Sequence, residues 1–348
     1  MTWPRLGSFA MTLAAAALVA GCSNDPVGSS EIVPPPTTAP TTTTQVTTTT
    51  TSTSPSEALE TTTTAEPDPL FVELRLITGT PDRRFDDPGG IAIDSRDHLY
   101  VLDAGNDRVV EFDPDGEVVR VWDTAGAGDG ELDSLGFGGV AVDGDDNLFI
   151  VDNGNFRIQK LDPNGNYLTQ WGTEGLGDGQ FQRAIGIAVD AGGNVYVTDD
   201  GRPEIQVFDN NGVFIRKWGS AGSGDGEFQH PTGIAVDQEG NVYVADYENQ
   251  RVQKLDASGS FVQAWSTESG GTPEGIAIDA DGHIYVTDYD RGRVEVRGSD
   301  GELIADWKGG SSAGFRRPVA VAFDSGGNVY VSNQAGASVM VFAPPPFD

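Results

Sequence analysis

The stretch TGIAVDQEGNVYVAD at residues 232–246 holds the pattern that decides the fold. It joins two short apolar segments through a tight turn, and the first of them ends in aspartate. Five further copies occur: GGIAIDSRDHLYVLD at 89–103, GGVAVDGDDNLFIVD at 138–152, IGIAVDAGGNVYVTD at 185–199, EGIAIDADGHIYVTD at 274–288 and VAVAFDSGGNVYVSN at 319–333. The first-segment aspartates are Asp94, Asp143, Asp190, Asp237, Asp279 and Asp324, which gives spacings of 49, 47, 47, 42 and 45 residues. A period in the forties made of short strands is typical of a β-propeller.

Each copy, with the residues that follow it, divides into segments with strand character. In the fourth copy these are Gly233–Asp237, Asn241–Asp246, Arg251–Asp256 and Phe261–Trp265. The glycines and aspartates between them tolerate the positive φ angles of tight hairpins, which favours antiparallel pairing in chain order. Five copies end their fourth segment on a tryptophan, at Trp122, Trp171, Trp218, Trp265 and Trp307. We expect these tryptophans to cover the rim of each sheet.

The sixth copy lacks a fourth segment, because it stops at the prolines of residues 344–346. Residues 70–78, before the first copy, alternate like a β-strand. We therefore predict an all-β fold over residues 69–348, a six-bladed β-propeller with four antiparallel strands per blade, in which this N-terminal strand closes the last blade. The pattern leaves open which side chains the strand buries. The two alternatives are Val72, Leu74 and Leu76, or Phe71 and Ile77.

The N-terminal end of the chain has the pattern of an export signal. One positive charge, Arg5, precedes an alanine-rich apolar run over residues 6–20, which is too short to span a bilayer. Cys22 directly follows Val-Ala-Gly at 19–21, and this resembles the signal of bacterial lipoproteins, in which the cysteine is diacylated. We expect a signal peptide over 1–21 and a lipid on Cys22; the alternative is an ordinary secreted protein. Because Cys22 is the only cysteine, an intrachain disulfide and cysteine-based zinc sites are excluded.

Residues 23–68 are dominated by threonine, proline and serine. They contain too few apolar residues to form a core, so we expect residues 22–68 to be a lipidated, disordered stalk. A membrane anchor, a stalk and a propeller together predict a disc displayed on the extracytoplasmic face of a bacterial envelope, attached to the membrane through its lipid only.

The formal net charge is −32, and acidic residues concentrate in the predicted turns. A negative field of this size repels nucleic acid and anionic lipid head groups. Nucleic acid is therefore not an expected partner. The expected partner is an envelope protein, peptide or glycan, and the expected state is a monomer.

The fourth copy and its flanks closely resemble the NHL repeat family. The resemblance lies in PTGIAVD at 231–237, GNVYVAD at 240–246, NQRV at 249–252 and GDGEF at 224–228. The resemblance covers nearly all of the chain after residue 69, and it is specific for the propeller fold. It implies several activities: sensor domains of bacterial kinases, RNA-binding repressors, ubiquitin ligases and peptidyl-hydroxyglycine lyases with a central metal. This sequence departs from the ligases because it has no RING-type Cys/His cluster, and its charge disfavours the RNA-binding role.

The three histidines do not predict a shared zinc site. His98 and His283 lie in the turn between the first and second strands of their copies, whereas His230 precedes a first strand, at the opposite face.

Three turns resemble fragments of calcium loops, at Asp113–Gly116, Asp143–Asp146 and Asp279–Gly282. A complete loop needs more oxygen ligands at a fixed spacing, and hairpin turns favour aspartate and glycine in any case. We expect no cofactor, with calcium as the alternative.

Two registers of the repeat bear on a binding site. The residues before the first-strand glycine should surround the axis: Gly89, Gly138, Ile185, Thr232, Glu274 and Val319. Only Glu274 is charged, which departs from the several acidic and amide ligands of gluconolactonase-like enzymes. The second register is an Asp…Arg pair that recurs in four copies, at Asp103/Arg108, Asp152/Arg157, Asp246/Arg251 and Asp288/Arg293, and recurrence predicts a structural ion pair.

Departures from this repetition are where we expect a binding site. The third copy has Asp200, Arg202 and, in the arginine register, Glu204. Neighbouring loops carry Tyr247, Tyr289 and Arg291, residue types favoured as interface anchors. The candidate binding residues are therefore Asp200, Arg202, Tyr247, Glu274, Tyr289 and Arg291, and no catalytic or metal-binding residue is assigned.

The sequence predicts a lipid-anchored extracytoplasmic propeller that binds or senses a protein, peptide or glycan. The alternative is a metal-dependent hydrolase or lyase, similar to a gluconolactonase or an amidating lyase, with its site in the central channel. A structural envelope protein is the third possibility.

Overall fold

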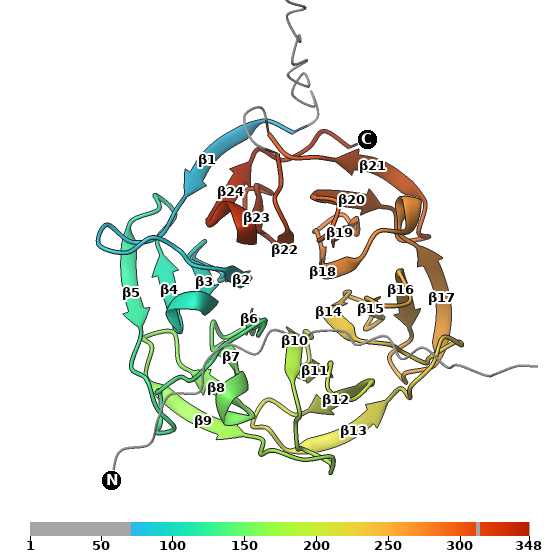
Figure 1. Ribbon diagram of the computed structural model, residues 1–348, viewed down its shortest axis with the longest axis horizontal. Coiled ribbons are helices and arrows are strands. Elements are labelled where there is room, and N and C mark those ends of the chain that lie inside the picture. Colours follow the sequence, from blue (N-terminus) through green and yellow to red (C-terminus); the bar gives the residue numbers. More distant parts are fainter. Residues whose placement is uncertain (1–70, 311–313, 348) are drawn as a thin grey trace, which may run out of the picture. The chain divides into compact units, whose positions relative to one another are not determined.

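The computed structural model describes residues 71–310 and 314–347. Within them, strands β1 to β24 form six four-stranded antiparallel sheets arranged around an axis (Figure 1). The first blade consists of β2 (Pro88–Ile93), β3 (Leu99–Asp103), β4 (Arg108–Phe112) and β5 (Val118–Trp122), in that order from the axis outward. The predicted six-bladed β-propeller is confirmed.

The next four blades repeat this order. Blade two is β6 (Val140–Val142), β7 (Leu148–Asp152), β8 (Arg157–Leu161) and β9 (Tyr167–Trp171); blade three is β10 (Ala184–Val189), β11 (Val195–Asp199), β12 (Glu204–Phe208) and β13 (Phe214–Trp218). Blade four is β14 (Pro231–Val236), β15 (Val242–Asp246), β16 (Arg251–Leu255) and β17 (Phe261–Ser266); blade five is β18 (Pro273–Ile278), β19 (Ile284–Asp288), β20 (Arg293–Arg297) and β21 (Leu303–Trp307). The predicted strands of the fourth copy differ from these bounds by one or two residues.

The sixth blade joins the two ends of the described chain. It contains β22 (Pro318–Phe323), β23 (Val329–Asn333) and β24 (Ser338–Phe342), and β1 (Glu73–Ile77) pairs antiparallel with β24 as its outer strand. The predicted closure by the N-terminal strand is confirmed.

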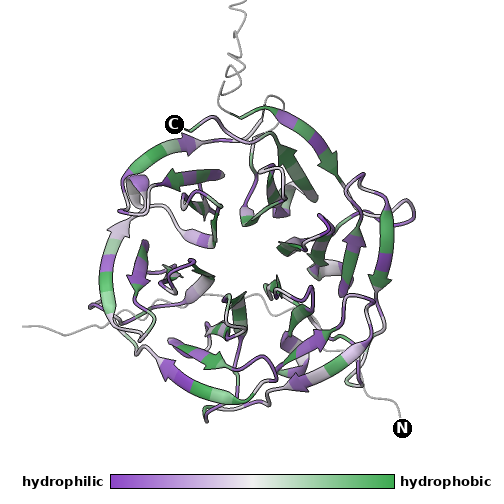
Figure 2. Ribbon diagram, turned by 180° about the vertical axis from the view of Figure 1, so that it is seen from behind, coloured by the Kyte–Doolittle hydropathy of each residue, from purple (hydrophilic) through white to green (hydrophobic). Residues whose placement is uncertain are grey.

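The second of the two burial alternatives for this strand is the correct one. Phe71 and Ile77 are buried, and the Phe71 ring stacks on Trp307 with centroids 3.9 Å apart. Val72, Leu74 and Leu76 are exposed on the outer surface. Outer strands elsewhere also alternate hydrophobic and hydrophilic residues (Figure 2).

The core lies between neighbouring blades. Six clusters of buried side chains form it, and each takes residues from two adjacent sheets. Most of the outer-strand tryptophans are half-buried, and an added Cβ on the hairpin glycine of the following blade would meet the ring. Gly212, at φ +84°, lies against Trp171, and Gly259, at φ +87°, lies against Trp218. These glycines therefore provide both the turn conformation and the space for the ring.

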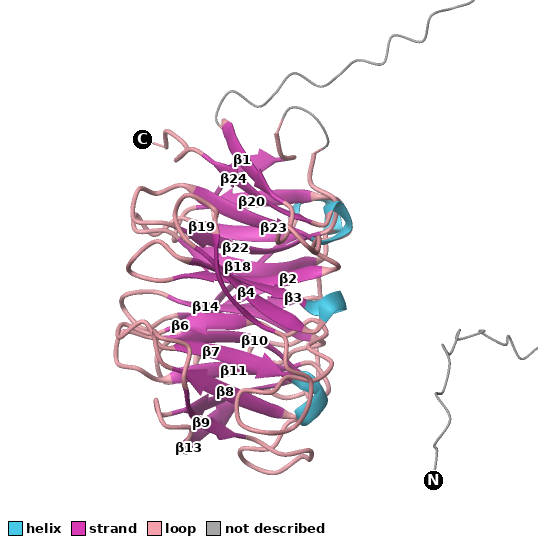
Figure 3. Cartoon of the chain, turned by 90° about the vertical axis from the view of Figure 1, so that its left-hand side faces the viewer, coloured by secondary structure: helices cyan, strands magenta, loops and turns pink. Residues whose placement is uncertain are grey.

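The strand ends define two faces, which we call the turn face and the loop face. The turn face carries the hairpins between first and second and between third and fourth strands. There the recurring aspartates organise the turns: Asp237 Oδ1 accepts the backbone N–H groups of Glu239 at 2.9 Å and Asn241 at 2.8 Å. The loop face carries the other connections and, in the described residues, the short 3-10 helices (Figure 3).

The predicted signal peptide, Cys22 and the stalk lie outside the described residues. In the described part of the chain, no helix is long and apolar enough to cross a membrane.

Candidate functional site

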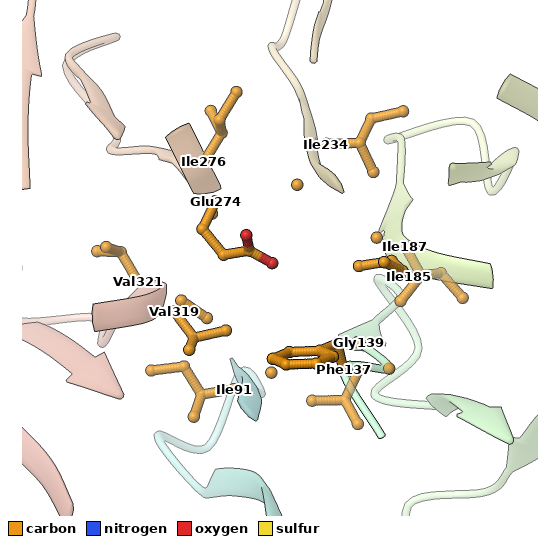
Figure 4. Close-up of a pocket in the computed structure, with 17 residues that line it drawn as sticks. Ile91, Phe137, Gly139, Ile185, Ile187, Ile234, Glu274, Ile276, Val319 and Val321 are labelled. Atoms are coloured by element: carbon orange, nitrogen blue, oxygen red, sulfur yellow. The ribbon is translucent and has the colours of Figure 1, made fainter. Parts of the chain in front are cut away.

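The central channel is apolar except at one point. Isoleucine and valine side chains from the first strands surround it, together with glycines and Phe137 (Figure 4). Ile185, Glu274 and Val319 belong to the register that the sequence places around the axis, and they line the channel as predicted. Glu274 is the one charged side chain among these described lining residues, and its carboxylate points into the channel (Figure 4).

A cavity of about 170 Å³ lies at the loop-face mouth of this channel. Its lining comes mainly from blades three, four and five and consists of Phe137, Arg183, Ile185, Asp200, His230, Thr232, Tyr247, Glu274 and Tyr289. We call this cavity the mouth. Its polar and aromatic residues occupy two registers that vary among the repeats: the residue that follows the second strand, and the one that precedes the first strand.

The first of these registers holds five different residue types in the six repeats: Ala104, Asn153, Asp200, Tyr247, Tyr289 and Gln334. The second holds Asp87, Gly136, Arg183, His230, Thr272 and Arg317. The first and second strands, by contrast, follow one sequence pattern in all six repeats. The mouth is therefore the place where a symmetric scaffold presents an asymmetric set of groups.

Buried aspartates at the ends of second strands position the mouth residues. Asp246 Oδ1 accepts the backbone N–H of Gln229 at 2.7 Å, directly before His230. In blade three, Asp199 accepts the backbone N–H of Arg183 at 2.8 Å. His230 then adopts a left-handed φ of +55° before Pro231, a conformation unusual for a non-glycine residue.

The four predicted Asp…Arg ion pairs are present and buried. Their Nε–Oδ2 distances run from 2.6 Å for Arg108–Asp103 to 3.1 Å for Arg293–Asp288. Each arginine also binds backbone carbonyl groups of the preceding connection, as Arg251 does with Gly224 at 2.7 Å. The pairs are therefore the structural brace that holds each connection at the loop face.

Arg202 is part of this bracing system and does not line the mouth. Its guanidinium is buried, and it donates to the carbonyl oxygens of Gly177 at 3.1 Å and Gln180 at 3.3 Å. These are the contacts that Arg251 makes in blade four, so Arg202 replaces the missing arginine from a shifted position. Glu204 accepts from Arg202 and does not take over its role.

Asp200 connects two basic side chains across the mouth. It forms an ion pair with Arg183, and His230 Nδ1 contacts its other carboxylate oxygen. Only 4% of the Asp200 side chain is exposed, whereas Arg183 and His230 are about half exposed at 53% and 51%. The three groups form a continuous chain of polar contacts along the blade-three and blade-four side of the mouth.

The carboxylate of Glu274, unlike that of Asp200, has no ion-pair partner in the part of the chain that the structure describes. It is 7% exposed, and no hydrogen bond or ion pair reaches its carboxylate from the described residues. Burial raises the pKa of Glu274 to about 8; the charge of Arg183 opposes this rise and that of Asp290 adds to it. The group is a carboxyl that titrates near neutral pH and faces an apolar space.

Two tyrosines complete the wall of the mouth. The Tyr289 hydroxyl donates to Gln334 Oε1 at 2.7 Å, and the guanidinium of Arg317 lies 5.3 Å from the centre of its ring. Burial, with a contribution from the charge of Glu274, raises the pKa of both Tyr247 and Tyr289. Both phenols therefore stay protonated at neutral pH.

Of the candidate residues taken from the sequence, the structure brings Asp200, Tyr247, Glu274 and Tyr289 together at the mouth. Arg291 lies outside the mouth lining; it donates to the carbonyl of Gly270 at 2.7 Å.

The sequence did not identify Phe137, Arg183 and His230 as members of this site. The available signal was weak: Phe137 occupies the register where four copies have proline, and Arg183 and His230 stand one residue before that register.

The other two histidines serve the turn face. His98 Nδ1 lies 2.8 Å from Glu111, and His283 Nδ1 lies 2.9 Å from Asp279. They lie at the opposite ends of the strands from His230, as the sequence predicts. Within residues 71–310 and 314–347, no three His, Cys, Asp or Glu side chains are grouped so as to hold a metal ion.

Four segments of the chain match the NHL repeat model, at residues 85–112, 181–208, 228–255 and 271–296. With the six-bladed ring, these matches support the resemblance to the NHL repeat family. No curated protein matches the chain.

Solved structures share the fold at low sequence identity. A gluconolactonase from Xanthomonas campestris has a TM-score of 0.59 and 18% identity over 81% of this chain and 97% of its own. A streptogramin B lyase has a TM-score of 0.57 and 13% identity, covering 78% of this chain and 97% of its own. A catalytically inactive virginiamycin B lyase from Staphylococcus aureus, solved with quinupristin, has a TM-score of 0.56 and 11% identity over 77% and 98%. At this identity the likeness shows the fold alone.

Proposed function

We propose that this protein is a binding or sensing module that takes a protein, peptide or glycan ligand at the mouth. We further propose that a lipid on Cys22 holds it on the extracytoplasmic face of a bacterial membrane. The observation that carries the binding role is the convergence of Arg183, Asp200, His230, Glu274 and two tyrosines on one cavity. A purely structural role would recur in all six blades, as the Asp…Arg brace largely does.

Binding at the mouth can be tested by removing two of its aromatic side chains. The purified protein is probed on arrays of peptides and envelope-type glycans, and the variant Phe137→Ala/Tyr247→Ala should lose the signals that the wild type gives. The matched control is Leu176→Ala, because Leu176 is an exposed apolar residue of a blade connection that does not line the mouth. Signals that survive the double change, or that Leu176→Ala abolishes, would place the site elsewhere.

The anchor is tested separately. Cys22→Ser should release the protein from the membrane fraction and abolish labelling by a fatty-acid probe. A wild-type protein that takes up no label contradicts the lipidation.

A metal-dependent hydrolase or lyase is the second candidate, favoured by the fold likeness to a gluconolactonase and to lyases. The described residues do not fit a metal site, because no group of three potential ligands converges. We therefore derive no step through a metal. Metal analysis of the purified protein, with a screen for lactone and phosphoester hydrolysis, separates the candidates: a stoichiometric, tightly held metal together with turnover supports the enzyme.

A further inference from the structure

The Glu274 carboxylate is a buried acceptor without a donor. It is 7% exposed and points into an apolar channel, toward the side on which Phe137 lies (Figure 4). No described side chain forms a hydrogen bond or ion pair with it. A buried carboxylate in this state destabilises the fold unless a partner compensates its charge. A ligand that supplies positive charge at this point would be that partner.

The surroundings of Glu274 select the kind of cation. Phe137, Tyr247 and Tyr289 line the same cavity, whose volume is about 170 Å³. Aromatic faces attract organic cations through the ring quadrupole, and the attraction strengthens where water is excluded. Three aromatic rings and one carboxylate suit an ammonium group on a carbon chain, which needs apolar contact as well as charge.

The basic residues at the mouth are already engaged. Arg183 forms an ion pair with Asp200, which His230 also contacts. The guanidinium of Arg317 lies over the ring of Tyr289, which lines the mouth. None of these side chains forms an ion pair with Glu274, and the net charge of −32 attracts positive ions to the protein.

We propose that the mouth binds the ammonium group of an organic amine, with Glu274 as its counter-ion and Phe137, Tyr247 and Tyr289 as its aromatic wall. The proposal rests on the proposed binding function and names its ligand class. A second cavity of about 460 Å³ adjoins the mouth between blades three and four, and it shares Asp200 and His230 with it. Pro203, Ala221 and Phe228 line this second cavity, which gives the remainder of an amine ligand an apolar surface.

The affinity for an amine should depend on pH, because only ionised Glu274 can pair with it. The charged and titratable groups that face or surround Glu274 are Arg183, Asp200, His230, Tyr247, Tyr289, Asp290 and Arg317. An alkylammonium, like lysine, keeps its proton up to a pKa of about 10.4. Since the pKa of Glu274 is about 8, affinity should rise about tenfold between about pH 7 and about pH 9.

The test uses calorimetric titration of the full-length protein with n-butylammonium, n-butanol and butyrate. We expect n-butylammonium to bind, with an affinity at least about tenfold above that of n-butanol and butyrate. Glu274→Gln should weaken binding about tenfold or more at about pH 9. Glu302→Gln is the matched control, because it removes the same charge from an exposed position on the turn face, outside the lining of both cavities, and it should leave binding within about twofold.

Butyrate or n-butanol binding as tightly as the amine overturns the proposal, and so does an affinity that ignores pH or the loss of Glu274. Melting curves of Glu274→Gln verify that the variant is folded. If n-butylammonium does not bind while array ligands still depend on Phe137 and Tyr247, the amine class is wrong and the binding function stands. If those array signals do not depend on the mouth residues, the proposed function itself fails.

Discussion

Asp256 on the turn face and Glu274 at the loop-face mouth are both acidic side chains near strand ends, yet their surroundings shift their pKa values in opposite directions. Hydrogen bonds from the Ser258 side chain and from the backbone N–H of Ser260 lower the pKa of Asp256. Burial without a donor raises the pKa of Glu274 to about 8. The turn face uses carboxylates to make turns, whereas the mouth keeps one carboxylate available.

This difference follows from the backbone at each face. Tight turns present N–H groups that point at the aspartate of the same turn, so its charge is satisfied locally. At the mouth, the first strands converge on the axis and their N–H groups pair with the second strands. A side chain on a first strand, such as that of Glu274, therefore has no backbone N–H from its own turn to bind. Its hydrogen-bond donors can come only from other blades or from a ligand.

Both faces depend on a closed ring of six blades, and opening that ring should have the largest effect on stability. A version of the protein starting at residue 80 lacks β1, the buried side chains of Phe71 and Ile77, and the ladder to β24. The two side chains alone contribute about 3–6 kcal/mol. The free edge of β24 also invites aggregation. We expect this version to be insoluble or to melt far below one that starts at residue 69. Equal melting temperatures and solubility would show that β1 does not close the ring.

The two recurring aspartates of one repeat should differ in their effect on stability. Asp246 is fully buried and binds Arg251 at 2.7 Å, so Asp246→Ala leaves a largely buried guanidinium unpaired and should cost about 3 kcal/mol. Asp237→Ala on the turn face removes the turn hydrogen bonds and the acceptor of the Tyr243 hydroxyl but leaves no buried charge unpaired, so it should cost less, about 1 kcal/mol. Urea unfolding of Asp246→Ala and Asp237→Ala measures the difference. A larger loss in Asp237→Ala would reverse the roles of the two faces.

The two faces should also differ in how their carboxyl groups make stability depend on pH. Between the usual Glu pKa and about 8, the folded protein holds a proton on Glu274 that the unfolded chain has lost. Stability from this group therefore falls as the pH rises through that window, by up to about 1.4 kcal/mol per pH unit, and is constant above it. Glu274→Gln should remove the fall, so the variant gains on the wild type from about pH 5 to about pH 8.

Asp256→Asn is the control of opposite sign. Its lowered pKa stabilises the fold above the unfolded value, and that contribution disappears as the pH falls. Melting curves across the pH range measure both variants. A constant difference between Glu274→Gln and the wild type would show that Glu274 is not the group that titrates.

The smallest expected effect concerns calcium at the turn face. Asp279 Oδ1 already accepts the N–H groups of Asp281 at 3.0 Å and His283 at 2.8 Å, and Oδ2 lies 2.9 Å from the His283 ring. Because these oxygens serve the turn, a chelator should change the melting temperature by less than about 1 °C, as expected for a change that breaks no named interaction. A clear drop on adding chelator, restored by calcium, would contradict this expectation.

The sequence alone determined the architecture. Six copies of one sequence motif carry the turn residues and the strand pattern of every blade. The local sequence preferences therefore favour the same structure as the packing of the whole ring. The missing fourth strand and the unassigned segment at 70–78 were sufficient to predict the closure. The Asp…Arg ion pairs were also predictable, because their spacing of five residues recurs across a fixed loop.

Only the tertiary structure decided what lies at the mouth. His230 and Tyr289 are 59 residues apart in the chain, and Phe137 lies 93 residues before His230, yet all three line one cavity because the ring brings equivalent registers to one axis. The sequence likewise could not show that Arg202 is buried in the brace, since the replacement depends on the path of a loop. Nor could it choose between the two burial patterns of the N-terminal strand, because alternation fixes two faces but not which of them meets the core.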